Sequence, residues 1–130
     1  NYDIVLVDRS QASFFAYQLN NGNVRTLLEP AYEETLKADF YKNCNFTTIY
    51  LHCDSQIAIE RMKHSRGTLD AIESHGPDYQ DTVKKYYDEC FALYESLRPG
   101  IKIDTSLNDQ VTCSKIAFDF VMKQLELRTK

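Results

Sequence analysis

Short apolar runs alternate with longer stripes of apolar residues along this chain. Residues 4–7 are a continuous run of Ile, Val, Leu and Val, which predicts a strand covered on both faces, as in parallel sheets. Residues 47–51 and 101–104 are rich in β-branched residues and predict two further strands. Because helical stripes follow these runs, the order predicts an α/β fold with a parallel sheet.

The helical stripes show apolar residues at steps of three and four. The most regular stripe runs from Tyr79 to Leu97, before Pro99 and Gly100. Pro30 suits the first turn of another helix, which would continue to Phe40. The remaining predicted helices are one capped by Ser10 that carries Phe14 and Tyr17, one capped by Asp54 or Ser55 that carries Ile57, Ile59 and Met62, and one with Val111, Ala117, Phe118, Val121 and Leu125.

Composition is that of an ordinary globular protein. The 130 residues are 43% hydrophobic and 26% charged, which predicts a single domain over 1–130. A net charge of −4 argues against a general nucleic-acid or membrane-surface binder, since both need a basic field. There is no apolar run near the roughly 20 residues that span a bilayer and no signal pattern, so a cytoplasmic location is expected. Four cysteines without a C-x-x-C pair predict no metal site.

An acid and a guanidinium follow the first apolar run directly. Asp8 and Arg9 would lie at the carboxyl end of a strand, which is where open α/β sheets bind ligands. Residues 8–18 read Asp-Arg-x-x-x-Ser-x-x-Ala-Tyr-Gln, and this pattern resembles the Asp-Arg-Tyr/His signature of thymidylate kinases. Taken alone, Asp-Arg would be an exposed pair of little energetic consequence.

A second stretch extends the resemblance. Residues 66–73 read Arg-Gly-x-Leu-Asp-x-Ile-Glu after a basic helix end, and they resemble the lid of the bacterial type of thymidylate kinase. Without the resemblance, the cations and Gly67 would mark only a helix C-terminus. The resemblance implies a lid at about 62–76 and a three-layer, mostly parallel sheet flanked by helices. It also implies that residues 1–130 are the carboxyl-terminal two-thirds of a P-loop nucleoside monophosphate kinase-like fold.

The resemblance further implies an activity, the transfer of the ATP γ-phosphate to dTMP or another deoxynucleoside monophosphate, with Mg²⁺ bridging the donor phosphates. Asp8, Arg9 and Arg66 would be catalytic. Asp8 would contact Mg²⁺ through water, Arg9 would hold the acceptor phosphate, and Arg66 would close over the phosphates. Ser10, Ser13, Phe14, Tyr17 and Gln18 would join Arg9 in binding the acceptor, and Arg61, Ser106 and Leu107 would join Arg66 in binding ATP.

Three departures from the family pattern keep other functions open. Ser10 stands where the family has Tyr or His near the sugar, and Ala71 replaces a lid arginine. None of the four glycines precedes a lysine, so the sequence contains no G-x-x-x-x-G-K-[S/T] phosphate loop. We therefore expect an amino-terminal part that is lacking here or is supplied by another chain. A deoxynucleoside kinase and a non-catalytic nucleotide-binding relic or regulatory subunit are the alternatives, and the resemblance allows a homodimer.

Overall fold

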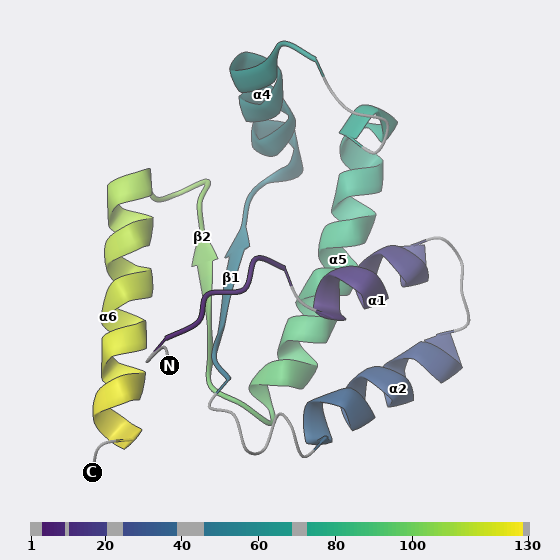
Figure 1. Cartoon of the computed structure of the whole chain (residues 1–130). Coiled ribbons are helices and arrows are strands. Elements are labelled where there is room, and N and C mark those ends of the chain that lie inside the picture. Colours follow the sequence, from purple (N-terminus) through teal and green to yellow (C-terminus); the bar gives the residue numbers. More distant parts are fainter. Residues whose placement is uncertain (1–3, 10, 21–24, 39–45, 69–72, 129–130) are drawn as a thin grey trace.

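Helices of different lengths surround a small parallel sheet in this computed structural model, which describes residues 4–9, 11–20, 25–38, 46–68 and 73–128 (Figure 1). The helices are α1 (Gln11–Asn20), α2 (Arg25–Lys37), α4 (Ser55–Arg66), α5 (Pro77–Glu95) and α6 (Gln110–Arg128), with a 3₁₀ turn at Glu73–His75. The strands are β1 (Thr48–His52) and β2 (Gly100–Asp104). The α/β class expected from the alternating pattern is confirmed.

The two strands run parallel and end at the same edge. Thr48 pairs with Gly100 at their start and His52 with Asp104 at their carboxyl ends. Gly100 is required by close packing, because a Cβ at this position would lie 2.9 Å from Cε2 of the Phe91 ring. The sheet therefore delivers His52 and Asp104 side by side to the loops that follow.

Helices lie on both faces of the strand pair. On one face, Tyr50 of β1 packs against Tyr87 and Phe91 of α5, with ring centroids 6.0 and 5.4 Å apart. The opposite face carries Ile49 and Leu51, because side chains alternate along a strand, and α6 packs there against β2. Leu51 is 57% exposed, so α6 covers this face only in part.

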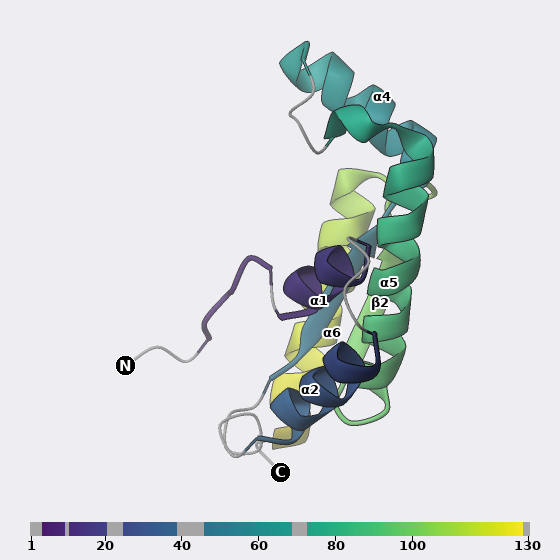
Figure 2. The ribbon, with the colours of Figure 1, turned by 90° about the vertical axis from the view of Figure 1, so that its right-hand side faces the viewer.

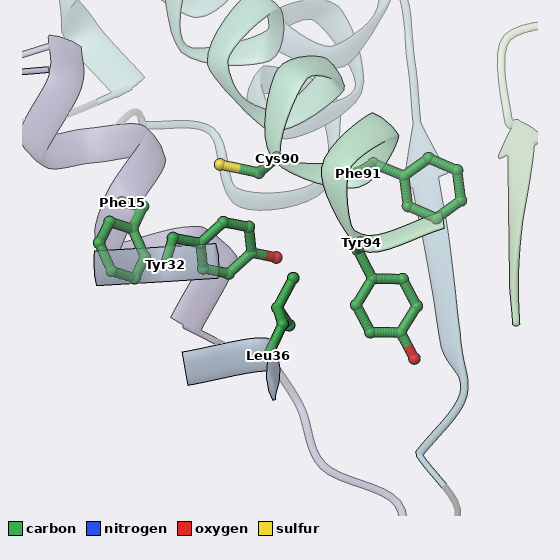
Figure 3. Close-up of a cluster of buried hydrophobic side chains, with 6 residues drawn as sticks. All are labelled: Phe15, Tyr32, Leu36, Cys90, Phe91 and Tyr94. Carbon is green, nitrogen blue, oxygen red and sulfur yellow. The ribbon is translucent and has the colours of Figure 1, made fainter. Parts of the chain in front are cut away.

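The main core lies between α1, α2 and α5 (Figure 3). Figure 3 shows Phe15, Tyr32, Leu36 and Cys90 facing one another between the helices, while the Phe91 ring lies on the strand side of α5. Ring contacts join Phe15 to Tyr32 at 4.8 Å between centroids. The buried members of this core cluster are Phe15, Tyr32, Leu36, Cys90, Phe91 and Tyr94. The core fixes α1 on α5, and so fixes the predicted acceptor-binding helix relative to the sheet.

Two predictions of local structure are wrong. Residues 4–7 form no strand: they have no regular secondary structure, and their exposed fractions are 49, 71, 87 and 72%. An apolar run becomes a strand only when a neighbouring strand satisfies its backbone, and the described residues provide no neighbour for it. Helix α2 begins at Arg25, so Pro30 lies inside it and not in its first turn.

The expected three-layer, mostly parallel sheet is thus represented by two strands among the described residues. Within the same residues, no helix combines the length and apolar character that a membrane crossing requires.

Candidate functional site

The candidate site lies at the carboxyl edge of β1 and β2, where two loops meet. Residues 53–54 connect β1 to α4, and residues 105–109 connect β2 to α6. The loops lie side by side because the strands are parallel and in register. Thr105 extends this pairing, since its N–H donates to the His52 carbonyl at 2.8 Å. This edge is the usual ligand-binding edge of an open α/β sheet.

Ser106 joins the two loops through its hydroxyl. The Asp54 N–H donates to Ser106 Oγ at 2.7 Å, and the hydroxyl is 3.5 Å from Cys53 Sγ. The Ser106 N–H in turn donates to Asp104 Oδ1 at 2.8 Å. One residue therefore fixes the end of β2 against the start of α4.

Arg61 reaches from the middle of α4 back to the same loop. Its Nη2 donates to the Thr105 carbonyl at 2.9 Å, and its Nη1 lies 3.4 Å from Thr105 Oγ1. The side chain is exposed, and a guanidinium carries five N–H donors. Arg61 can therefore keep its contact with Thr105 and still donate to an anion or a base.

A cavity of about 600 Å³ opens beside Arg61, within the range of small-molecule sites. Ile49 and Leu51 of β1 and Ala117 of α6 form its apolar wall. Its polar groups come mainly from the loop after β2 and the start of α6. The remaining lining residues are Arg61, Thr105, Asn108, Asp109, Gln110, Cys113 and Ser114.

Helix caps orient the two helices that enter the site. Asp54 caps α4 by accepting the N–H groups of Gln56 at 3.0 Å and Ile57 at 3.2 Å. Asp109 caps α6 by accepting the Thr112 N–H at 2.7 Å. Both carboxylates accept backbone N–H groups of the first helical turn, as N-cap residues do. Of the two caps predicted for α4, Asp54 and Ser55, the structure has Asp54.

Charge at the strand ends is set by hydrogen bonds and burial. The Ser106 N–H lowers the pKa of Asp104, and the Thr112 N–H lowers the pKa of Asp109, because these donors stabilise the carboxylates. Burial, followed by the positive charge of Lys102, lowers the pKa of His52 below 6.5. At neutral pH the edge therefore carries a neutral imidazole beside the Asp104 carboxylate.

The predicted acceptor-binding residues of α1 lie on a helix held by aromatic contacts. Tyr17 meets Tyr87 of α5 edge to face at 6.2 Å. Phe14 is 58% exposed and rests edge to face on the buried Phe15. Ser13 and Gln18 are half-buried. Phe14 is thus the aromatic ring of α1 with most surface left for stacking on a ligand.

The predicted catalytic residues are not assembled. Asp8 and Arg9 lie in an exposed bend before α1, and Arg9 has φ 66°. Arg66 is exposed at the last turn of α4, where Gly67 adopts the left-handed conformation of a C-cap. Figures 1 and 2 show the Asp8–Arg9 end of the purple segment apart from this end of α4. Ser10 and Ala71 lie outside the described residues. Of the predicted lid at 62–76, the structure describes residues 62–68, which include the end of α4, and residues 73–76.

Of the predicted ATP-binding residues described here, Arg61 lines the cavity and bonds to Thr105. Ser106 does not line the cavity and bonds to the start of α4 through the Asp54 N–H. Leu107 is 83% exposed and is not among the residues that line the cavity. Sequence reasoning missed Thr105 and Asn108, whose Nδ2 donates to the Asp104 carbonyl at 2.8 Å. The sequence feature that could have indicated both residues is the largely polar segment 105–109 directly after the strand.

Asp8 is the residue that the resemblance assigns to Mg²⁺ binding, and no other was predicted. No three His, Cys, Asp or Glu side chains cluster as a metal site in the described part of the chain, and Asp8 lies in the exposed bend. The residues described here do not build a metal site, so we derive no step through Mg²⁺.

No family model, curated protein or solved structure matches this chain.

Proposed function

We propose that this chain is the acceptor-binding and lid-bearing part of a deoxynucleoside monophosphate kinase similar to thymidylate kinases. It would act in the cytoplasm on dTMP or a related monophosphate, with ATP as donor. The observation that carries the proposal is that Arg61 and Ser106 both bond to the loops at the carboxyl edge of the parallel strands, beside a cavity of about 600 Å³ that Arg61 lines. The resemblance gave both residues to ATP binding, although they are 45 positions apart in the sequence.

The cavity offers chemistry suited to a nucleoside. Its Ile49, Leu51 and Ala117 wall suits the flat apolar surface of a base. Asn108 and Gln110 supply amide groups that both donate and accept hydrogen bonds. Arg61 adds a permanent positive charge at the rim.

The acceptor would lie against α1, where Phe14 exposes its ring and Gln18 carries an amide. Arg9 would bind the monophosphate through two parallel N–H···O bonds, which lysine cannot reproduce. The donor phosphates require a glycine-rich loop from outside these 130 residues, since no such sequence occurs within them.

A non-catalytic nucleotide-binding role is the second candidate. It is favoured by the exposed bend that holds Asp8 and Arg9 apart from the cavity. In that case the chain would bind nucleotide at the β1–β2 edge without transferring phosphate.

Calorimetric titration of the chain with a non-hydrolysable ATP analogue and, separately, with dTMP tests the proposal. We expect dTMP to bind the chain and the ATP analogue to bind once the phosphate loop is supplied, and Arg61→Ala to weaken the ATP analogue by about tenfold or more, since hydrogen bonds from a charged group contribute about 1.5–3 kcal/mol. Lys63→Ala is the matched control, because Lys63 is an exposed cation on the same helix that does not line the cavity. If neither nucleotide binds, both candidate functions are refuted. If nucleotide binds but no phosphate is transferred after the phosphate loop is supplied, the kinase function is refuted and the non-catalytic binding function is supported.

A further inference from the structure

The guanidinium of Arg61 is held at its outer end by the two loops that follow the strands. Nη2 donates to the Thr105 carbonyl at 2.9 Å, and Nη1 donates to Thr105 Oγ1 at 3.4 Å. Nη1 also donates to Cys53 Sγ at 3.6 Å. The edge of the group formed by its two terminal nitrogens is therefore already engaged within the protein.

A second edge of the same group is left for a ligand. A guanidinium carries five N–H donors in one fixed plane, and one N–H of Nη2 lies parallel to the Nε–H. No contact with a described residue engages the Nε–H of Arg61. The side chain is exposed and lines the cavity of about 600 Å³. The Nε–Nη2 edge is thus a pair of parallel donors, which matches two oxygens of one phosphate or carboxylate group.

Thr105 holds Arg61 from a rigid part of the fold. The Thr105 N–H donates to the His52 carbonyl at 2.8 Å, and its hydroxyl donates to the same carbonyl at 3.1 Å. Because the hydroxyl proton is used there, the lone pairs of Oγ1 can accept from Arg61. Both of the Thr105 acceptors therefore rest on the end of β1.

We propose that Thr105 is a positioning residue that aims the Nε–Nη2 edge of Arg61 at one phosphate group of a bound nucleotide. That the ligand is a nucleotide rests on the proposed function, whereas the geometry itself requires an oxyanion with two oxygens. Within the described part of the chain, no acidic side chain forms an ion pair with Arg61. A side chain that is held in place before binding loses less freedom when the ligand arrives.

Proton–nitrogen NMR of the Arg61 Nε–H tests the positioning in this chain without a nucleotide. Arg61→Lys assigns the signal by its loss, and inorganic pyrophosphate should shift it. Thr105→Val keeps the shape of the side chain and removes the hydroxyl. It should increase the picosecond-to-nanosecond motion of the Nε–H and weaken pyrophosphate by about two- to tenfold, the cost of immobilising one long side chain. Thr105→Ser should behave as the wild type.

Thr82→Val is the matched control, because the Thr82 hydroxyl donates only within α5, to the Asp78 carbonyl at 3.0 Å. It should change neither the motion of the Arg61 Nε–H nor the affinity for pyrophosphate. Circular dichroism checks that each variant is folded.

Titration of a form that carries the phosphate loop with a non-hydrolysable ATP analogue joins this role to the proposed function. Arg61→Lys should weaken the analogue by about tenfold or more, since one ammonium cannot replace two parallel donors. Thr105→Val alone should weaken it by about two- to tenfold. Added to Arg61→Lys, it should cause no further loss, because Thr105 acts through the guanidinium.

Three results overturn the proposal: an Arg61 Nε–H signal that pyrophosphate does not shift, a Thr105→Val variant in which its motion is unchanged, or losses of affinity that add in the double variant. A shift with pyrophosphate but no binding of the ATP analogue refutes the proposed function only. Binding of the analogue without any effect of Thr105→Val refutes the positioning role only.

Discussion

Replacing Ser106 by alanine tests whether one hydroxyl holds the two loops of the candidate site together. The change removes the acceptor of the Asp54 N–H, which is now 2.7 Å from Ser106 Oγ, and the contact to Cys53 Sγ. The Ser106 backbone N–H, which donates to Asp104, is kept. The variant therefore separates the link between loops from the link within the β2–α6 loop.

A neutral hydrogen bond contributes about 0.5–1.5 kcal/mol net, and we expect Ser106→Ala to lower the free energy of unfolding by this amount. For a chain of this length, that corresponds to a fall in Tm of roughly 2–6 °C. Thermal unfolding followed by far-ultraviolet circular dichroism measures it. Because the link aligns α4 with the loop that Arg61 contacts, affinity for the ATP analogue should fall as well.

Two further variants make the result specific. Ser65→Ala removes a hydroxyl that bonds only within α4, at 3.2 Å to the Met62 carbonyl, and should change stability by less than about 0.5 kcal/mol. Ser106→Thr keeps the hydroxyl and should restore most of the loss. If Ser106→Ala unfolds at the same temperature as Ser65→Ala, the loops are not joined as described.

Three other perturbations follow from the structure. Gly100→Ala should destabilise the chain by about 1–3 kcal/mol in urea unfolding, because its Cβ would lie 2.9 Å from the Phe91 ring; relief by Phe91→Leu in the same background checks the cause. The lowered pKa of His52 means that the unfolded chain binds the proton more tightly, so stability should be full above pH 6.5 and fall as pH drops below it. His52→Gln should flatten that part of the pH profile, and an unchanged slope would exclude His52. Arg9→Ala, in a form that carries the phosphate loop and transfers phosphate, should lose most turnover with little change in Tm, since Arg9 is exposed; wild-type rates would remove Arg9 from the mechanism.

Periodicity predicted the helices well where apolar residues alone decide the packing. The Tyr79–Leu97 stripe became α5, at Pro77–Glu95, with Val83 and Cys90 buried. Thr47–Leu51 became β1 with a shift of one residue. In these segments local preference and tertiary packing favour the same structure.

Residues 4–7 show where such reasoning stops. Their composition favours a strand, but a strand forms only when a neighbouring strand pairs with it. The sequence of a segment does not tell whether such a neighbour exists. Pro30 gives a second case: a proline that suits a first turn lies within α2 because Tyr32 and Leu36 are buried against the core. Packing of that face outweighs one missing N–H.

The candidate site was only half predictable for the same reason. Arg61 and Ser106 were predicted through a resemblance, but the approach of the two loops to which they bond depends on the His52–Asp104 register, which no local pattern encodes. Thr105 takes part through its carbonyl, a group every residue has. Asp8 and Arg9 follow the apolar run whose pairing is unsatisfied, so their position depends on where that run finds a strand. Whatever pairs with β1 therefore decides whether the acceptor and donor halves of the proposed site face each other.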